Sequence, residues 1–134
     1  MRDMHNNISV LHAITPAAVG TTGIAGGKLS GALDRRGFET VEFVYSSGAS
    51  ASAADTITPV IYEGDTTNGS FTSVAAADLL GTEAVMTLTA AQTKRVGYGG
   101  NKRYLKIRLY GTGTATAVVA ASAILGMPAI RPQS

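Results

Sequence analysis

Residues 95–110 read RVGYGGNKRYLKIRLY, and the second half of this stretch alternates strictly between apolar and polar side chains. Leu105, Ile107 and Leu109 fall on one side of an extended chain. The other side carries Tyr104, Lys106, Arg108 and Tyr110. A period of two predicts a β-strand with one face in the core and the other against solvent or a partner. We expect this strand to be the central one of the fold, preceded by a glycine-rich loop at residues 97–101.

Other segments have the same strand character, and almost none has the pattern of an amphipathic helix. Residues 38–45 alternate and follow a turn predicted at residues 34–37. Residues 56–63 form another strand, in which Pro59 favours an edge position or a bulge. Further strands are expected at residues 71–74, 83–89 and 115–125, with a connector at 90–95 and with the last strand apolar on both faces. About seven or eight short strands predict an all-β fold, a single-domain β-sandwich or jelly roll.

The N-terminal segment, residues 1–31, differs from the rest and is expected to form an extended arm. The sandwich domain would then occupy residues 32–134. Within the arm, residues 8–14 form a possible strand that Pro16 should end. Residues 19–31 are glycine-rich and nearly uncharged, as in arms that become ordered against a neighbouring subunit.

Charge is sparse and unevenly distributed along the 134 residues. Only 15% of the residues are charged, and none is cysteine, which excludes disulfides and thiolate metal sites. All 9 acidic residues lie at or before Glu83, whereas six basic residues fall between Lys94 and Arg108. This basic segment also contains tyrosines, so we expect a partner-binding surface there. Its residues are Lys94, Arg95, Tyr98, Lys102, Arg103, Tyr104, Lys106, Arg108 and Tyr110.

The partner of this basic segment is open to more than one interpretation. A solvated basic face would have the same composition, and cations with tyrosines also suit stacking on single-stranded nucleic acid. We favour an acidic protein surface over nucleic acid, because outward tyrosine and arginine are common at protein interfaces. Membrane insertion is not expected, since the longest apolar run, residues 115–127, is too short to span a bilayer.

No motif predicts catalysis, a metal or a cofactor. The glycine-rich run around Lys28 fails the P-loop pattern, because Thr22 replaces its first glycine and Leu29 its magnesium-binding Ser or Thr. The histidines, His5 and His12, have no companion at metal-ligand spacing. We therefore expect a protein that is not an enzyme and that needs no cofactor or metal.

One loop contains residue types that suit calcium. Glu63, Asp65 and Asn68 could supply oxygen ligands, although their spacing is not that of an EF-hand. A tight turn explains Asp65 and Asn68 equally well, because both residue types favour turns.

Several short phrases of the chain, taken together, resemble small head-associated structural proteins of tailed bacteriophages and prophages. These phrases are RVGY at 95–98, NKRYLKI at 101–107, YEGD at 62–65, FTSVAAADLLG at 71–81 and GMP at 126–128. The resemblance implies a capsid decoration (cement) protein that lies on the capsid surface of the virion and is made in the bacterial cytoplasm. Its partners would be the major capsid protein and other copies of itself in a homo-oligomer.

Two other functions are compatible with the same features. A low-copy head–tail connector or neck protein would share the β-rich composition. The YEGD phrase and Arg103-Tyr104-Leu105 also resemble discoidin-like carbohydrate-binding sandwiches. A carbohydrate-binding β-sandwich module would use Tyr62, Phe71 or Tyr98 as stacking platforms.

Overall fold

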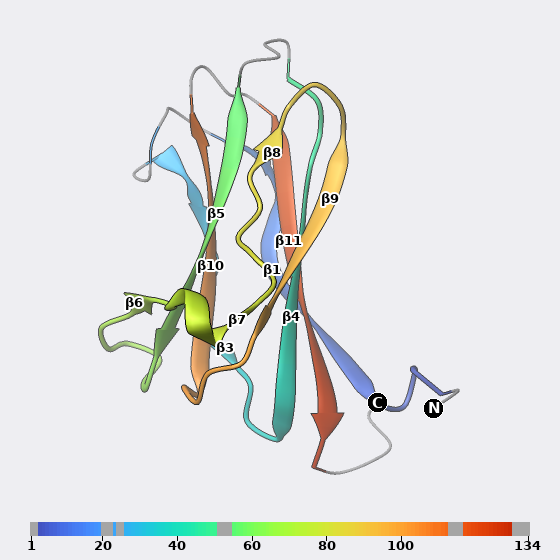
Figure 1. Cartoon of the computed structure of the whole chain (residues 1–134), viewed down its shortest axis with the longest axis vertical. Helices are drawn as coiled ribbons and strands as arrows, with labels where there is room; N and C mark the ends of the chain where they lie inside the picture. The colour runs from blue at the N-terminus through green and yellow to red at the C-terminus, as the bar shows by residue number, and fades with distance from the viewer. Residues whose placement is uncertain (1–2, 20–22, 24–25, 51–54, 113–116, 130–134) are drawn as a thin grey trace.

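The computed structural model describes residues 3–19, 23, 26–50, 55–112 and 117–129 of the chain. In this part of the chain, eleven strands form two antiparallel sheets that pack face to face (Figure 1). Five of these strands are only two residues long, which leaves six longer ones. The prediction of an all-β sandwich is confirmed.

The five-stranded sheet contains both terminal strands. Its order is β1 (Ile8–Ala18), β11 (Val118–Pro128), β4 (Phe38–Ser47), β9 (Gln92–Tyr98) and β7 (Leu79–Leu80). Strand β11 pairs with β1 on one side and with β4 on the other, so it lies inside the sheet. The strand predicted at residues 115–125 is confirmed from Val118 onward, while positions 115–116 lie outside the described residues.

The six-stranded sheet contains the alternating strand that the sequence singled out. Its path is β2 (Lys28–Leu29), β10 (Tyr104–Thr112), β5 (Thr56–Gly64) and β6 (Thr72–Ser73). Two further short strands complete it, β3 (Leu33–Asp34) beside β10 and β8 (Met86–Thr87) beside β5. A 3₁₀ turn, Ala76–Asp78, leads into β7. Strand β10 therefore has neighbours on both sides, as predicted for a central strand.

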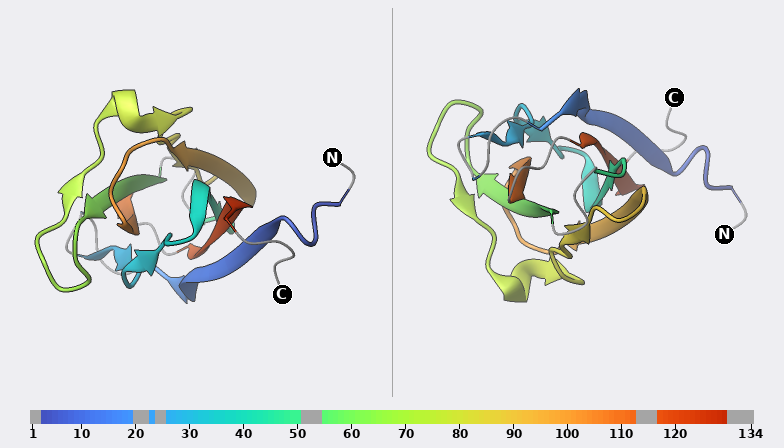
Figure 2. Two further views of the ribbon diagram at one scale, coloured as in Figure 1. Left: turned by 90° about the horizontal axis from the view of Figure 1, so that it is seen from below. Right: turned by 90° about the horizontal axis from the view of Figure 1, so that it is seen from above.

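The core lies between the two sheets and follows the period of two. Leu105, Ile107 and Leu109 on β10 are almost completely buried, whereas the residues between them are only half-buried. On the facing sheet, Phe43 on β4 and Val96 on β9 are fully buried. Figure 2, which looks along the long axis, shows the sheets wrapped around this interior. Burial of these aliphatic and aromatic side chains is the main stabilising contribution to the sandwich.

Pro59 lies where the sequence predicted, at an edge of a sheet. Strands β6 and β8 pair with the two ends of β5 and leave its middle, where Pro59 sits, without a strand on that side. The Glu83 carboxylate covers part of this gap by accepting a hydrogen bond of 2.6 Å from the Ile61 N–H. A side chain thus takes the place of a neighbouring strand.

Three expectations about strand limits are corrected by the structure. Strand β9 (Gln92–Tyr98) occupies most of the connector predicted at residues 90–95 and the first two residues of the loop predicted at 97–101. Only Met86–Thr87 of the strand predicted at 83–89 is extended and paired. Pro16 does not end β1. This edge strand contains bulges around Ile14, and the backbone N–H that proline lacks is not needed for a hydrogen bond between strands at such a position.

The predicted N-terminal arm is largely part of the sandwich. Strand β1 pairs along β11, and β2 pairs with β10 at Leu109 and Arg108. A Cβ at Gly27 would lie 2.7 Å from the Tyr110 Cβ, so a glycine is needed where the segment meets β10. Positions 1–2, 20–22 and 24–25 of the predicted arm lie outside the described residues.

Candidate functional site

The candidate site is a shallow hollow on the outward side of the six-stranded sheet, which we call the outer sheet face. It has a volume of about 170 Å³. Its lining comes from three strands and one loop, and consists of Leu29, Tyr62, Phe71, Lys106 and Arg108. The antiparallel register places Tyr62 beside Lys106, and it places Val60 and Leu29 on either side of Arg108. The two cations are therefore flanked along the sheet by neutral side chains.

Lys106 is held in place by an aromatic ring. Its ammonium nitrogen lies 4.2 Å from the centroid of the Phe71 ring, a distance suited to a cation–π contact. Phe71 in turn packs over Gly64, where an added Cβ would lie 3.1 Å from the ring. The close approach at Gly64 fixes the ring, and the ring fixes the direction of the Lys106 charge.

Arg103 and Lys102, which precede β10, are paired within the protein. Arg103 donates through Nε and NH2 to the two Asp34 carboxylate oxygens at 2.9 and 2.7 Å, and its guanidinium lies 4.9 Å from the Tyr104 ring centroid. The Arg103 hydrogen bond lowers the pKa of Asp34 below its usual value. Lys102 donates to Asp65 at 2.7 Å, and this contact raises the pKa of Lys102. Both pairs are exposed to solvent, which screens their charges, so each contributes little to stability.

Lys94 and Arg95 lie on the other sheet. Both belong to β9 in the five-stranded sheet, where Arg95 forms an ion pair with Glu42 at 3.6 Å. The nine residues predicted to form one surface are therefore divided between two sheets and a loop. The outer sheet face brings together Lys106 and Arg108, with Tyr104 and Tyr110 on the same side of β10.

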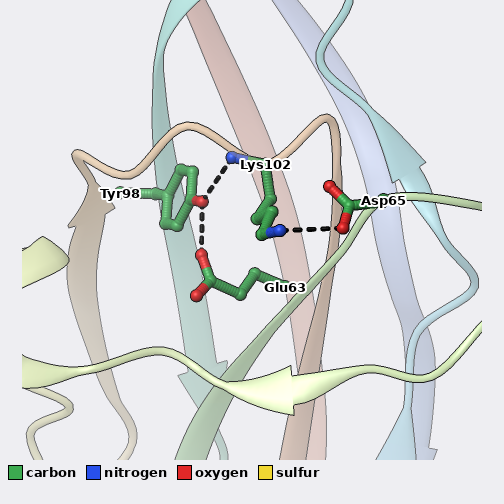
Figure 3. A network of polar contacts seen from close by, with 4 residues as sticks. All are labelled: Glu63, Asp65, Tyr98 and Lys102. Atoms are coloured by element: carbon green, nitrogen blue, oxygen red, sulfur yellow. Dashed lines mark hydrogen bonds and ion pairs between the residues drawn. The ribbon is translucent and has the colours of Figure 1, made fainter.

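Tyr98 was predicted to bind a partner, and this prediction is wrong. Its side chain is only 1% exposed and lies in the core. Its hydroxyl donates to Glu63 Oε2 at 2.5 Å and accepts from the Lys102 backbone N–H at 2.9 Å (Figure 3). Burial first, and then the hydrogen bond to Glu63, raise the pKa of Tyr98 to about 12. Tyr98 is thus the link that ties the loop before β10 to strand β5.

Arg35 is an important residue that sequence reasoning missed. Its guanidinium donates to three backbone carbonyl groups, those of Lys102 at 2.6 Å, Gly100 at 3.0 Å and Glu39 at 3.3 Å. It also lies 5.4 Å from the centroid of the Tyr98 ring. The sequence showed only a turn at this position, and no local pattern indicates contacts with residues more than sixty positions away.

The carboxylates considered for calcium have other contacts. Glu63 accepts the Tyr98 hydroxyl, and Asp65 accepts the Lys102 ammonium. Among the described residues, no group of three or more His, Asp or Glu side chains is arranged to hold a metal ion. In the same part of the chain, no helix is long and apolar enough to cross a membrane.

Comparison with known proteins does not assign this chain to a family. No known protein family matches the sequence, and no curated protein is similar to it. Solved structures with a similar arrangement of sheets include the CBM22-1 xylan-binding domain from Paenibacillus barcinonensis Xyn10C, with 12% identity and a TM-score of 0.47 over 92% of this chain and 88% of that one. Murine APRIL also matches, with 10% identity and a TM-score of 0.45 over 90% of this chain and 99% of that one.

A third similar structure is a much longer chain. It comprises the CBM22-1 and GH10 modules of an endo-1,4-β-D-xylanase from Clostridium thermocellum, complexed with xylohexaose. The match has 10% identity and a TM-score of 0.47, and it covers 97% of this chain but only 28% of that one. At these identities and TM-scores, all three likenesses concern the arrangement of the two sheets alone.

Proposed function

We propose that this protein is a non-enzymatic docking module that binds an acidic protein surface through its outer sheet face. The observation that carries the proposal is the Lys106 ammonium, which lies over the Phe71 ring in the hollow that Arg108 also lines. A positioned cation loses little side-chain entropy on binding, and the aromatic and aliphatic rim adds apolar contact around it. Such a surface is complementary to carboxylates on a partner and would speed their encounter at low salt.

The partner that the phage resemblance implies is the major capsid protein. The protein would then be a capsid decoration protein, located on the surface of the virion. Decoration needs only a modest interface at each site, because many copies bind one shell and copies joined in a homo-oligomer bind with higher avidity. The half-buried outer residues of β11, Ala120, Ser122 and Ile124, offer a nearly uncharged surface for contact between copies.

A double charge reversal tests the docking surface. Lys106→Glu with Arg108→Glu should weaken binding to phage heads, purified from a strain that lacks this gene, by at least about tenfold. Lys94→Glu with Arg95→Glu is the matched control, because it makes the same charge change on the other sheet. The control should bind within about twofold of the native protein. Equal losses in both variants, or normal binding of the first, would disprove the assignment of this face.

The number of copies per particle separates decoration from a role at the neck. Quantitative mass spectrometry of purified particles should find hundreds of copies, in proportion to the major capsid protein. About a dozen copies or fewer would instead indicate a connector at a single vertex, and absence from the particle would refute a virion role.

Carbohydrate binding is a second candidate, favoured by the hollow itself. Tyr62 lines this hollow and could stack on a sugar ring, while Lys106 and Arg108 would suit an acidic saccharide. Phe71 is less suited to stacking, because it already packs on Lys106 and Gly64, and the buried Tyr98 is not accessible. A glycan array that includes uronic acid and sulfated glycans would detect this function, and an array without hits would remove it.

A further inference from the structure

A second hollow lies at one end of the sandwich, and it shares no lining residue with the hollow on the outer sheet face. It has a volume of about 230 Å³ and lies between the turn from β3 to β4 and the loop from β9 to β10, which meet at the lower end of Figure 1. We call it the arginine hollow. Its lining consists of Arg35, Arg36, Gly37, Phe38, Asn101 and Arg103.

The lining contains three guanidinium groups and no carboxylate. Asp34 lies beside it and neutralises Arg103 through two hydrogen bonds. Within the described part of the chain, Arg35 donates hydrogen bonds only to carbonyl oxygens, which have no formal charge, so its own positive charge is retained. Arg36 is exposed at the turn, where its backbone N–H donates to Asp34 at 2.9 Å. Three positive charges against the one negative charge of Asp34 leave the hollow with an excess of two.

The arginines are also largely held in place before any ligand arrives. Arg35 is fixed by three hydrogen bonds and by the Tyr98 ring, and Arg103 is fixed by Asp34 and the Tyr104 ring. A guanidinium group has five N–H donors, so each of these arginines keeps donors beyond those it uses internally. The turn is closed by the Phe38 N–H, which donates to the Arg35 carbonyl at 3.0 Å, and Gly37 has a φ of 87°. A rigid turn of this kind lowers the entropy lost when Arg36 binds an anion.

From this arrangement we propose that the arginine hollow binds a phosphate group. A phosphate monoester has a charge of about −1.5 to −2 at neutral pH, which matches the excess charge of the hollow. Its several oxygens can accept hydrogen bonds from more than one guanidinium at once. Asn101 adds an exposed side-chain amide at the rim, and Phe38 adds an apolar surface for the organic part of a phosphorylated ligand. The proposal uses residues separate from those of the docking surface, so either can fail without the other.

The test is an NMR titration of the full chain with inorganic phosphate, with sodium acetate at equal ionic strength as the comparison. Saturable shifts should appear at the amides of Arg36, Gly37, Asn101 and Arg103 with phosphate only. Arg36→Ala should weaken the apparent affinity about tenfold, the effect of losing one charge-assisted contact. Lys94→Ala, which removes an exposed cation on β9, should leave the affinity unchanged.

The outcomes decide the proposal and the source of the phosphate. Absence of saturation, an equal response to acetate, or equal losses in the Arg36 and Lys94 variants would overturn it. A parallel titration with O-phosphoserine distinguishes two supporting results. Tighter binding than inorganic phosphate assigns an organic phosphate that contacts Phe38, and equal binding assigns free phosphate. Arg36 makes no side-chain contact that the fold needs among those described, so its variant should remain folded.

Discussion

Replacing Tyr98 by phenylalanine tests whether the loop before β10 is held by one hydroxyl group. The substitution keeps the buried ring and removes only the atom that joins Glu63 to the Lys102 N–H. The hydrogen bond that the hydroxyl donates to the Glu63 carboxylate is worth roughly 1.5–3 kcal/mol, and the one that it accepts from the Lys102 N–H is worth about 1 kcal/mol. Because Glu63 is half-exposed and water can replace part of the loss, we expect a net destabilisation of about 2–3 kcal/mol.

Urea denaturation at neutral pH measures this loss directly. An unfolding entropy of about 0.3 kcal/mol/K for a chain of this size predicts a fall in Tm of about 7–10 °C. Tyr104→Phe is the matched control, because that ring lies on the outward side of β10 and its hydroxyl forms no hydrogen bond to the loop among the described residues. A loss for Tyr98→Phe below about 0.5 kcal/mol, or equal to the control, would refute the reasoning.

The Tyr98→Phe variant should also change how the free energy of unfolding depends on pH in alkaline solution. The pKa of Tyr98 is raised from 10.0 to about 12, so the protonated hydroxyl stabilises the folded state. This contribution is complete below pH 10 and is lost as the pH rises through about 12. Tyr45, whose pKa burial also raises to about 12, remains in both proteins. The stability of Tyr98→Phe should therefore fall less steeply above pH 10 than that of the native protein, and parallel curves would contradict the assignment.

Two further substitutions address the turn beside the arginine hollow. Gly37→Ala should lower the free energy of unfolding in urea by roughly 1–2 kcal/mol, because φ is 87° at this position although no atom obstructs a Cβ. Gly31→Ala is the control, since Gly31 is equally unobstructed but has no positive φ, and it should cause a clearly smaller loss. Asp34→Asn should cost less than about 1 kcal/mol at neutral pH because the pair is exposed. Since the folded pKa of Asp34 is lowered, its contribution is present above its usual pKa of 3.8 and is lost as the pH falls below it. Native protein and variant should thus converge in acid, and a difference that persists there would refute the ion-pair explanation.

Local patterns predicted the parts of the fold that depend on period and composition. The alternation from Tyr104 to Tyr110 predicted which side chains of β10 are buried, because successive residues of a strand point to opposite faces. The turn before β4 and the edge position of Pro59 also follow from the properties of single residues. The candidate site was predicted only in part, since Lys106 and Arg108 lie on one face while Lys94 and Arg95 do not.

Strand β9 shows why the rest was missed. Three consecutive residues of β9 are exposed, Thr93, Lys94 and Arg95. The strand therefore lacks the alternation of apolar and polar residues by which a strand is recognised in a sequence. Gly97 resembles a loop residue, yet it lies inside strand β9. A glycine is needed there because a Cβ would lie 2.9 Å from the Leu80 Cβ on the neighbouring strand. A glycine required by a distant segment cannot be distinguished by sequence from a glycine in a turn.

The sequence by itself determined that this chain forms a β-sandwich and that β10 presents two cations on its outward side. Period and hydrophobicity act between near neighbours, so they are readable in one dimension. Only the tertiary structure decided that Tyr98 is buried, that Arg35 binds the carbonyl groups of a distant loop, and that the basic segment is divided between two sheets. Those outcomes depend on how strands far apart in sequence pair and pack, and local periodicity contains no information about that pairing.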